Sequence, residues 1–168
     1  RYGNVIASRG SFIPLWISMI ESDQPLMVTS LEMTRFLFTL DDAVNTVLNS
    51  VEAAEGGEVF IPNISSFDMR TILVTLEKHM NKSFNYGISG LRPGEKLHED
   101  MLAKTELPYT FVVPGSVNLL AVRPQYTNRT HDDTWDRYQG KEFNSSLHVS
   151  KDVLELQSLI TKGLQETN

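Results

Sequence analysis

The chain has 168 residues, an apolar fraction of 40% and a formal net charge of −6, and it contains no cysteine. This length suits one domain of ordinary size, taken here as a single unit over residues 1–168. A negative charge without a basic cluster argues against nucleic acid or an anionic membrane as a partner, and no apolar run is long enough to span a bilayer. The lack of cysteine excludes thiolate chemistry and fits a reducing, cytoplasmic compartment.

The first part of the chain predicts one helix followed by two short strands. Apolar residues recur at helical spacing over residues 12–20, and Ser11 is a plausible N-cap for this helix. Short strands are expected at 26–29 and at 35–38.

Two capping patterns predict the starts of the next two helices. Thr39 with Asp42 three residues later is a capping box, and Ser65 with Asp68 suggests a helix over 66–80. The first of these helices has a regular apolar stripe. Its members are Leu40, Val44, Val47, Leu48 and Val51.

Further strands are expected at 58–62, 83–88 and 110–113, where β-prone runs are bounded by Gly, Pro or Asn. The stretch 115–147 has few periodic signals. Ser150 is expected to cap a final helix.

The motif L-R-P-G-E-K-L-H-E at residues 91–99 places a cation, a turn and a carboxylate in sequence. The proline steers Arg92 away from the α region, and Gly94 permits a positive φ. Glu95 and Glu99 are expected in the first turns of a short helix ending near Leu102, where carboxylates suit the positive end of the helix dipole. A fixed cation and a fixed acceptor suit a diphosphate and a ribose, whereas the simpler alternative is a helix entry with a solvated charge pair.

Two other stretches accompany this motif. Residues 1–11 read R-Y-G-N-V-I-A-S-R-G-S, and residues 33–44 read M-T-R-F-L-F-T-L-D-D-A-V. In this order the three stretches resemble the C-terminal half of extended short-chain dehydrogenase/reductases, in the polysaccharide-biosynthesis branch of UDP-N-acetylglucosamine 4,6-dehydratases and nucleotide-sugar epimerases. The resemblance covers most of residues 1–113 and returns weakly at 140–146. It implies an α/β fold: edge strands of a Rossmann-like parallel sheet plus a small substrate-binding lobe.

The redox motifs of that family do not occur in this sequence. There is no G-x-G-x-x-G or G-x-x-G-x-x-G, and no tyrosine has a lysine four positions later. The resemblance therefore implies the part of a dehydratase or epimerase that holds the UDP-sugar. NAD or NADP would serve the intact enzyme, and none is expected on this chain alone. An N-terminal half or a companion chain would be the partner, and homo-oligomerisation stays open. The alternative is a stand-alone, non-catalytic or vestigial binding domain.

The resemblance implies a set of substrate-binding residues and no catalytic or metal-binding residue. The set is Asn4, Arg9, Met27, Thr29, Arg35, Arg92 and Glu95.

Four of these residues would meet the diphosphate or the sugar. Asn4 would donate near the diphosphate, although a turn asparagine bonding its own backbone is the alternative. Arg9 would reach a phosphate or sugar, or remain a solvated loop charge. Arg35 and Arg92 would flank the diphosphate, where guanidinium groups give bidentate bonds. For Arg35 the alternative is an ion pair with an acidic neighbour in sequence.

The remaining residues would meet the nucleoside. Glu95 would accept from ribose hydroxyls, while Met27 and Thr29 match the strand that meets the uracil. His131, followed by two aspartates, is better explained as a solvated acidic loop than as a metal site.

Half of a two-part fold should also expose an apolar face where the cofactor half would pack. The residues expected there are Phe36, Phe38, Val59, Phe60 and Ile61.

Overall fold

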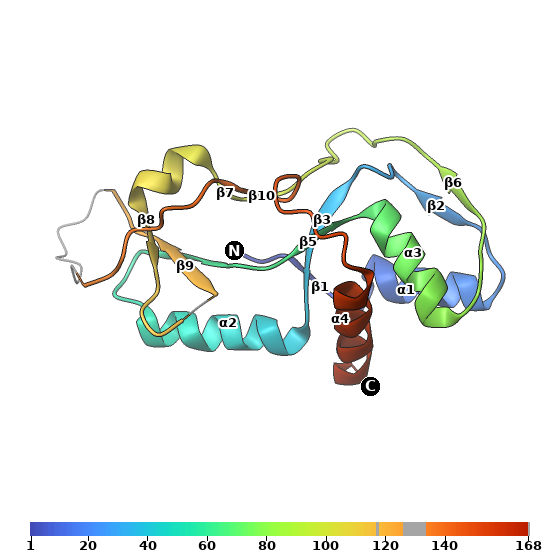
Figure 1. Ribbon diagram of the computed structural model, residues 1–168, viewed down its shortest axis with the longest axis horizontal. Helices are drawn as coiled ribbons and strands as arrows, with labels where there is room; N and C mark the ends of the chain where they lie inside the picture. The colour runs from blue at the N-terminus through green and yellow to red at the C-terminus, as the bar shows by residue number, and fades with distance from the viewer. Residues whose placement is uncertain (117, 126–133, 168) are drawn as a thin grey trace.

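The computed structural model describes residues 1–116, 118–125 and 134–167, which form helices, short strands and one 3₁₀ helix (Figure 1). In chain order the elements are β1 (Asn4–Val5), α1 (Phe12–Glu21), β2 (Leu26–Val28), β3 (Thr34–Phe38), α2 (Leu40–Ala53), β4 (Val59–Pro62), β5 (Ser66–Asp68), α3 (Met69–Met80), β6 (Tyr86–Ile88), β7 (Asp100–Leu102), η1 (Lys104–Tyr109), β8 (Thr110–Val112), β9 (Leu119–Val122), β10 (Phe143–Asn144) and α4 (Val153–Glu166).

Four small sheets connect these elements. One has the order β1-β3-β5, with β1 parallel and β5 antiparallel to β3. Strands β2 and β6 form a second, parallel pair. The other two sheets are antiparallel, in the order β4-β9-β8 and as the pair β10-β7. Parallel strands joined through helices confirm the predicted α/β class.

The main hydrophobic core lies where α1, α3 and α4 gather around the β1-β3-β5 sheet (Figure 1). Each helix turns its apolar side inward, as its spacing predicts. Helix α4 approaches the loop after β1 so closely that a Cβ at Gly163 would lie 2.8 Å from Ile6 Cγ2. The fully buried side chains of these helices include Ile13, Ile20, Ile72, Leu76, Leu156 and Ile160.

A smaller core lies at the other end of the molecule, among β4, β8 and β9. Trp135 is buried there, and the Arg123 guanidinium lies 4.5 Å from the ring centroids of both Trp135 and Phe111. Arg123 also faces Glu55 at 3.7 Å, so its buried charge is paired.

One predicted cap is confirmed and another is wrong. Thr39 and Asp42 form the capping box of α2. Residues 66–68 belong to β5 instead of a helix, because they pair with β3. Helix α3 therefore begins at Met69, and the side chain of Asp68 caps it by accepting from the Thr71 N–H.

Two further local predictions are wrong. The helix expected after the R-P-G turn does not form, and the chain instead enters β7 at Asp100, where β10 pairs with it. The final helix is capped by Asp152 rather than by Ser150. Ser150 supports this cap, because its Oγ accepts from the Asp152 N–H at 3.2 Å.

The predicted exposed apolar face is wrong for three of its five members. Phe36, Phe38 and Ile61 are at most 1% exposed, because they belong to strands that pack into the cores. Val59 is exposed and Phe60 is half-buried. The large exposed aliphatic surface lies on α2 instead.

Candidate functional site

The centre of the candidate site is the loop of residues 92–99, which begins with a tight turn. The Glu95 N–H donates to the Arg92 carbonyl at 3.0 Å, and Gly94 has φ +82°. Proline followed by a glycine at positive φ is the pattern of a type II turn. A side chain at Gly94 would strain this turn, which is why the motif needs glycine there.

Glu99 joins the far end of this loop to β1 and β3. Both of its carboxylate oxygens lie 3.2 Å from Asn4 Nδ2, and one accepts from the Phe36 N–H at 3.2 Å. The Arg35 Nε lies 3.5 Å from the same carboxylate. Two predicted site residues, Asn4 and Arg35, are therefore held by one carboxylate.

Arg35 anchors the loop as well as facing Glu99. Its guanidinium donates to the carbonyls of Thr34 at 2.8 Å, Leu97 at 3.3 Å and Lys96 at 3.0 Å. Its side chain is 14% exposed. Because these bonds occupy much of the donor capacity of its five N–H groups, Arg35 fixes the loop and has a limited share of its donors left for a ligand.

Glu95 joins the near end of the loop to β2. Its carboxylate accepts from Thr29 Oγ1 at 3.2 Å and from the Arg92 N–H at 3.2 Å. Met27 lies two residues before Thr29 and is exposed, on the same face of the extended chain. The structure thus brings Thr29 and Glu95 together, beside Met27.

The other two predicted residues lie on exposed segments. Arg92 is at the surface, and its backbone N–H and carbonyl form the turn with Glu95. Arg9 is exposed in the loop between β1 and α1. Exposed cations on a fixed backbone are suited to meeting a charged ligand from solvent.

A buried polar network supports the loop from behind. Thr34 Oγ1 lies 2.8 Å from His98 Nδ1 and 2.6 Å from Ser145 Oγ. Ser145 Oγ also accepts from the Glu99 N–H at 2.8 Å. Because the members satisfy one another, the loop position is specified by hydrogen bonds from β3 and from the segment after β10. His98 is a member of this network through its Nδ1.

Arg1, the first residue of the R-Y-x-N motif, fixes the entry to β1. Its guanidinium donates to both oxygens of Glu106, at 2.7 and 2.6 Å, and to the Met101 carbonyl at 2.6 Å. The hydrogen bonds from Arg1 hold the pKa of Glu106 below its usual range, and the pKa of Arg1 is raised in turn. This pair positions the strand that carries Asn4.

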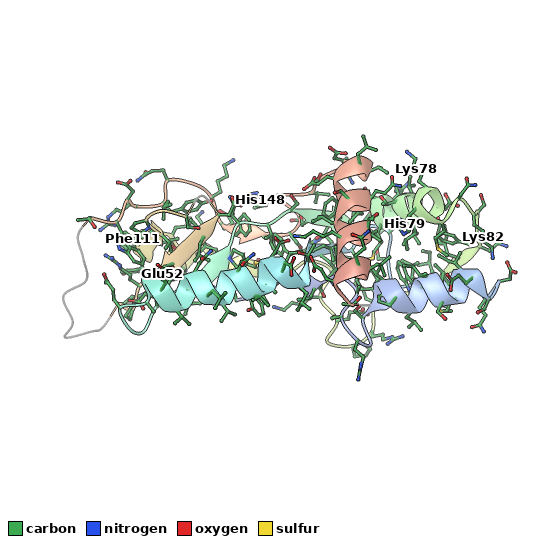
Figure 2. The ribbon with its side chains drawn as sticks, turned by 90° about the horizontal axis from the view of Figure 1, so that it is seen from below. Glu52, Lys78, His79, Lys82, Phe111 and His148 are labelled. Atoms are coloured by element: carbon green, nitrogen blue, oxygen red, sulfur yellow. The ribbon has the colours of Figure 1, made fainter. Side chains whose placement is uncertain are left out.

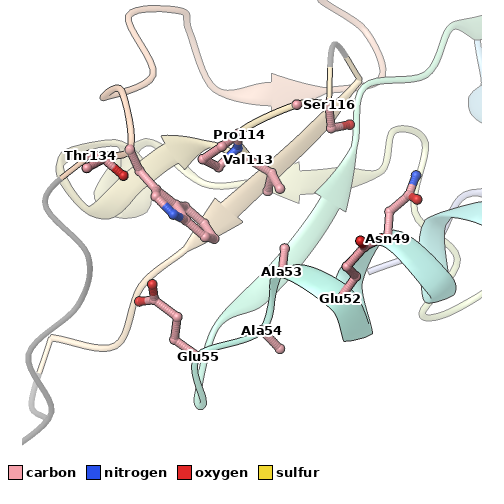
Figure 3. Close-up of a pocket in the computed structure, with 11 residues that line it drawn as sticks. Asn49, Glu52, Ala53, Ala54, Glu55, Val113, Pro114, Ser116 and Thr134 are labelled. Carbon is pink, nitrogen blue, oxygen red and sulfur yellow. The ribbon is translucent and has the colours of Figure 1, made fainter.

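The largest cavities lie away from this loop. One of about 580 Å³ opens between the end of α2 and the turn after β8 (Glu52 in Figure 2; close-up in Figure 3), and one of about 530 Å³ lies between α1 and the end of α3. Two more, of about 420 and 410 Å³, lie on α4 and along α2. A smaller cavity of about 170 Å³ is lined by Asn4, Ser8 and Ser11, among others. Of the predicted residues, only Asn4 lines any of these five cavities.

Sequence reasoning missed the role of Glu99. It was placed in the motif as a carboxylate near a helix start, whereas the structure makes it the acceptor shared by Asn4 and Arg35. Its position at the end of R-P-G-E-K-L-H-E was the only signal, because the partners lie 95 and 64 residues away in the chain.

Within the described ranges, no three His, Asp or Glu side chains gather as metal ligands would, and no helix is long and apolar enough to cross a membrane. The predicted acidic loop at His131 lies outside the described residues.

The fold and the three motifs define an α/β portion of an extended short-chain dehydrogenase/reductase. Residues 1–118 match the polysaccharide biosynthesis protein family, and the chain belongs to that family. The X-ray structure of Pen from Bacillus thuringiensis matches with a TM-score of 0.84 and 27% identity, over 100% of this chain and 50% of that chain.

Named relatives agree with this family. The chain is 41% identical over 111 residues to the capsular polysaccharide biosynthesis protein CapD of Staphylococcus aureus, covering 64% of this chain and 18% of CapD. It is 39% identical over 112 residues to a UDP-N-acetylglucosamine 4,6-dehydratase (inverting) of Campylobacter jejuni, covering 66% and 32%. It is 36% identical over 107 residues to a UDP-glucose 4-epimerase of Rickettsia felis, covering 64% and 31%. The chain spans less than a third of the length of these relatives.

Proposed function

We propose that this chain is the substrate-holding part of a nucleotide-sugar 4,6-dehydratase or epimerase in polysaccharide or glycan biosynthesis. Its substrate would be a UDP-sugar of the UDP-N-acetylglucosamine type. The family match and the printed activities of the C. jejuni and R. felis relatives support this proposal.

One observation carries the proposal. The loop at 92–99 contacts two sets of predicted site residues. Glu99, at its far end, accepts from Asn4 and faces Arg35, and Glu95, near its start, accepts from Thr29. These residues come from separate strands and loops, and only the fold brings them to one loop.

The proposed roles follow the chemistry of the side chains. Arg92 and Arg35 would bind the diphosphate, with Asn4 donating beside them, because guanidinium and amide N–H groups bond phosphate oxygens. Glu95 would accept from the ribose hydroxyls. Arg9 would reach a phosphate or the sugar.

The uracil would lie against β2. Met27 is exposed there and offers a polarizable apolar contact, while Thr29 is already oriented by its bond to Glu95.

In an intact enzyme of this kind, NAD or NADP would supply the hydride chemistry. The sequence has no Gly-rich dinucleotide motif and no Tyr-x-x-x-Lys, so its residues do not fit that cofactor. We assign the redox step to another half of the fold, on the same polypeptide or on a companion chain. The residues of this chain would bind and orient the nucleotide.

Calorimetric titration with UDP and UDP-N-acetylglucosamine tests the proposal. Arg92→Ala should weaken binding by about 1.5–3 kcal/mol, the range for hydrogen bonds to charged groups. Arg92→Lys should recover only part of the loss, since an ammonium cannot bind in the bidentate manner. Arg70→Ala, which removes an exposed arginine from α3, is the matched control and should have little effect.

Binding of NAD or NADP by an assembled enzyme should be unchanged in Arg92→Ala. If neither UDP nor the sugar nucleotide binds the wild-type chain, or if Arg92→Ala and Arg70→Ala behave alike, the proposed site is wrong. Binding of UDP without turnover in the presence of a competent redox half would favour a stand-alone binding domain.

A further inference from the structure

The segment from β10 to the start of α4 contacts the candidate site from outside the part of the chain that the family model matches. The match ends at residue 118, whereas this segment covers residues 143–152. It crosses the middle of the molecule in Figure 1, and His148 marks it in the view of Figure 2. Phe143, at its start, stacks on Phe36 with ring centroids 5.2 Å apart. The segment therefore lies directly against β3.

Both backbone polar groups of Glu99 bind Ser145 of this segment. The Ser145 N–H donates to the Glu99 carbonyl at 2.8 Å, and Ser145 Oγ accepts from the Glu99 N–H at 2.8 Å. The Ser145 carbonyl accepts from Ser66 Oγ at 2.6 Å, so β5 holds the serine in turn. Ser145 is 0% exposed. A buried residue with these bonds fixes the backbone that carries the carboxylate shared by Asn4 and Arg35.

The hydroxyl proton of Ser145 has two acceptors within reach. Thr34 Oγ1 lies 2.6 Å from Ser145 Oγ, and the Thr34 carbonyl lies 3.4 Å from it. Hydrogen bonds between two oxygens are favourable at about 2.5–3.0 Å. The Glu99 N–H can only donate, so Ser145 Oγ is an acceptor toward it and keeps its own proton for Thr34. The shorter distance makes Ser145 the donor to Thr34 Oγ1.

The direction of this bond determines where His98 carries its proton. Thr34 Oγ1 accepts from Ser145 and has one proton of its own, which it donates to His98 Nδ1 at 2.8 Å. Nδ1 is then the ring nitrogen without a proton, and the neutral ring is protonated at Nε2. A proton on Nδ1 would reverse the chain, because the Ser145 hydroxyl would then be left with the Thr34 carbonyl at 3.4 Å.

We propose that Ser145 is a positioning residue of the nucleotide site and that it acts through Glu99. A one-way chain of hydrogen bonds orients its hydroxyl. The chain runs from Ser145 through Thr34 to a neutral His98 that is protonated at Nε2. This inference rests on the proposed function for the identity of the ligand, whereas the direction of the chain depends on no nucleotide contact.

NMR of the histidine ring nitrogens tests the direction of the chain without nucleotide. At about pH 8, where a histidine ring is ordinarily neutral, His98 should show the pattern of the Nε2–H tautomer. The signals that disappear in His98→Gln assign this ring. In Ser145→Ala the chain loses its first hydroxyl, so the Nδ1–H tautomer should become detectable. A wild-type His98 protonated at Nδ1 would overturn the proposed direction.

Ser145→Ala tests the positioning role, because it removes the acceptor of the Glu99 N–H and leaves the bond to the Glu99 carbonyl. The Glu99 amide should exchange with solvent about tenfold faster, and UDP should bind about tenfold more weakly. Thr75→Val is the matched control. It removes another hydroxyl at 0% exposure, which donates to the Thr71 carbonyl at 2.8 Å. Its cost should appear in Tm, with Glu99 exchange and UDP affinity as in wild type.

Two results would overturn the positioning role. One is a UDP affinity that is equal in Ser145→Ala and wild type, and the other is an equal loss of affinity in Thr75→Val. If the wild-type chain binds no UDP, the proposed function fails, but the exchange rate of the Glu99 amide and the His98 tautomer still test the role of Ser145. In that case, a Glu99 amide that exchanges no faster in Ser145→Ala than in wild type would overturn it.

Discussion

Helices α2 and α3 have similar lengths, 14 and 12 residues, and each begins at a capped residue. Both carry an apolar stripe at helical spacing. The stripe of α3 is buried, with Ile72 and Leu76 at 0% exposure, whereas Leu48 and Val51 of α2 are 60% and 72% exposed. The difference lies in their surroundings, because α4 and the β1-β3-β5 sheet cover α3.

The comparison separates what an amphipathic pattern specifies from what it does not. The pattern specifies that a helix forms and which side needs a cover. It does not specify where the cover comes from. For α3 the cover is a distant part of the same chain, whereas the described residues leave the stripe of α2 exposed.

The largest expected effect is on the free energy of unfolding, and it tests whether the two helices differ in burial as described. Leu76→Ala should lower the free energy of unfolding by about 2–5 kcal/mol, because it leaves a cavity in the main core. Leu48→Ala should change it by less than about 0.5 kcal/mol in the isolated chain, because that side chain is already solvated. Urea unfolding followed by circular dichroism measures both. Equal losses would remove the distinction between the two helices.

Sequence reasoning predicted the elements whose signals are local. Thr39 with Asp42 predicted the start of α2, and the strand at 59–62 follows from β-prone residues between Gly and Pro. Sequence reasoning was wrong where contacts with residues distant in the chain determine the local structure. Residues 66–68 became a strand because β3 pairs with them, and the loop after Arg92 stays open because β3 and Ser145 hold it.

The candidate site shows the same limit. The resemblance identified Asn4, Arg35 and Glu95 one by one from their motifs. Glu99 connects Asn4 with Arg35, and Glu95 bonds Thr29, through contacts across 64 or more residues of chain, which no local pattern encodes. The prediction of an exposed apolar face was wrong for the same reason. Apolar strand residues such as Phe36 and Ile61 carry no local signal that tells whether they pack inside the chain or face a partner, and both are buried.

The second prediction concerns Glu99, which joins the loop of residues 92–99 to β1 and β3. Glu99→Gln puts an amide N–H₂ where Asn4 Nδ2, the Phe36 N–H and Arg35 Nε now find acceptors. If Glu99 positions Asn4 and Arg35, this change should weaken UDP binding by about 1–2 kcal/mol, in the range for an unsatisfied buried donor.

Asp100→Asn is the matched control, because it removes one negative charge from the next residue without touching the Glu99 cluster. Asp100 accepts from Asn144 Nδ2 at 2.6 Å instead. UDP affinity should be nearly unchanged in this variant. Equal or tighter UDP binding in Glu99→Gln would show that Glu99 only repels the diphosphate and positions nothing.

The smallest effect comes from the cap of α3. Burial alone would raise the pKa of Asp68, but hydrogen bonds from Lys151 and Thr71 outweigh it and hold the pKa below its ordinary value of 3.8. A carboxyl with a depressed folded-state pKa stabilises the fold above its unfolded pKa, and this contribution is lost as the pH falls through the folded-state pKa.

Asp68→Asn keeps a good N-cap but removes the charge. It should therefore cost about 0.5–1 kcal/mol at pH 7, and the difference from wild type should vanish in strongly acidic solution. Urea unfolding at several pH values measures this. A difference that persists unchanged to pH values far below 3.8 would mean that the charge of Asp68 is not its cause.

The most direct test of the central claim is a titration of the ¹⁵N-labelled chain with UDP, followed by NMR. The account predicts saturable shifts of the amides in the loop 92–99, around Asn4, in residues 27–29 and around Arg35, while the amides of α2 (Leu40–Ala53) stay in place. The absence of saturable shifts, or shifts confined to α2 and the cavities beside it, would contradict the claim that these residues form one nucleotide site.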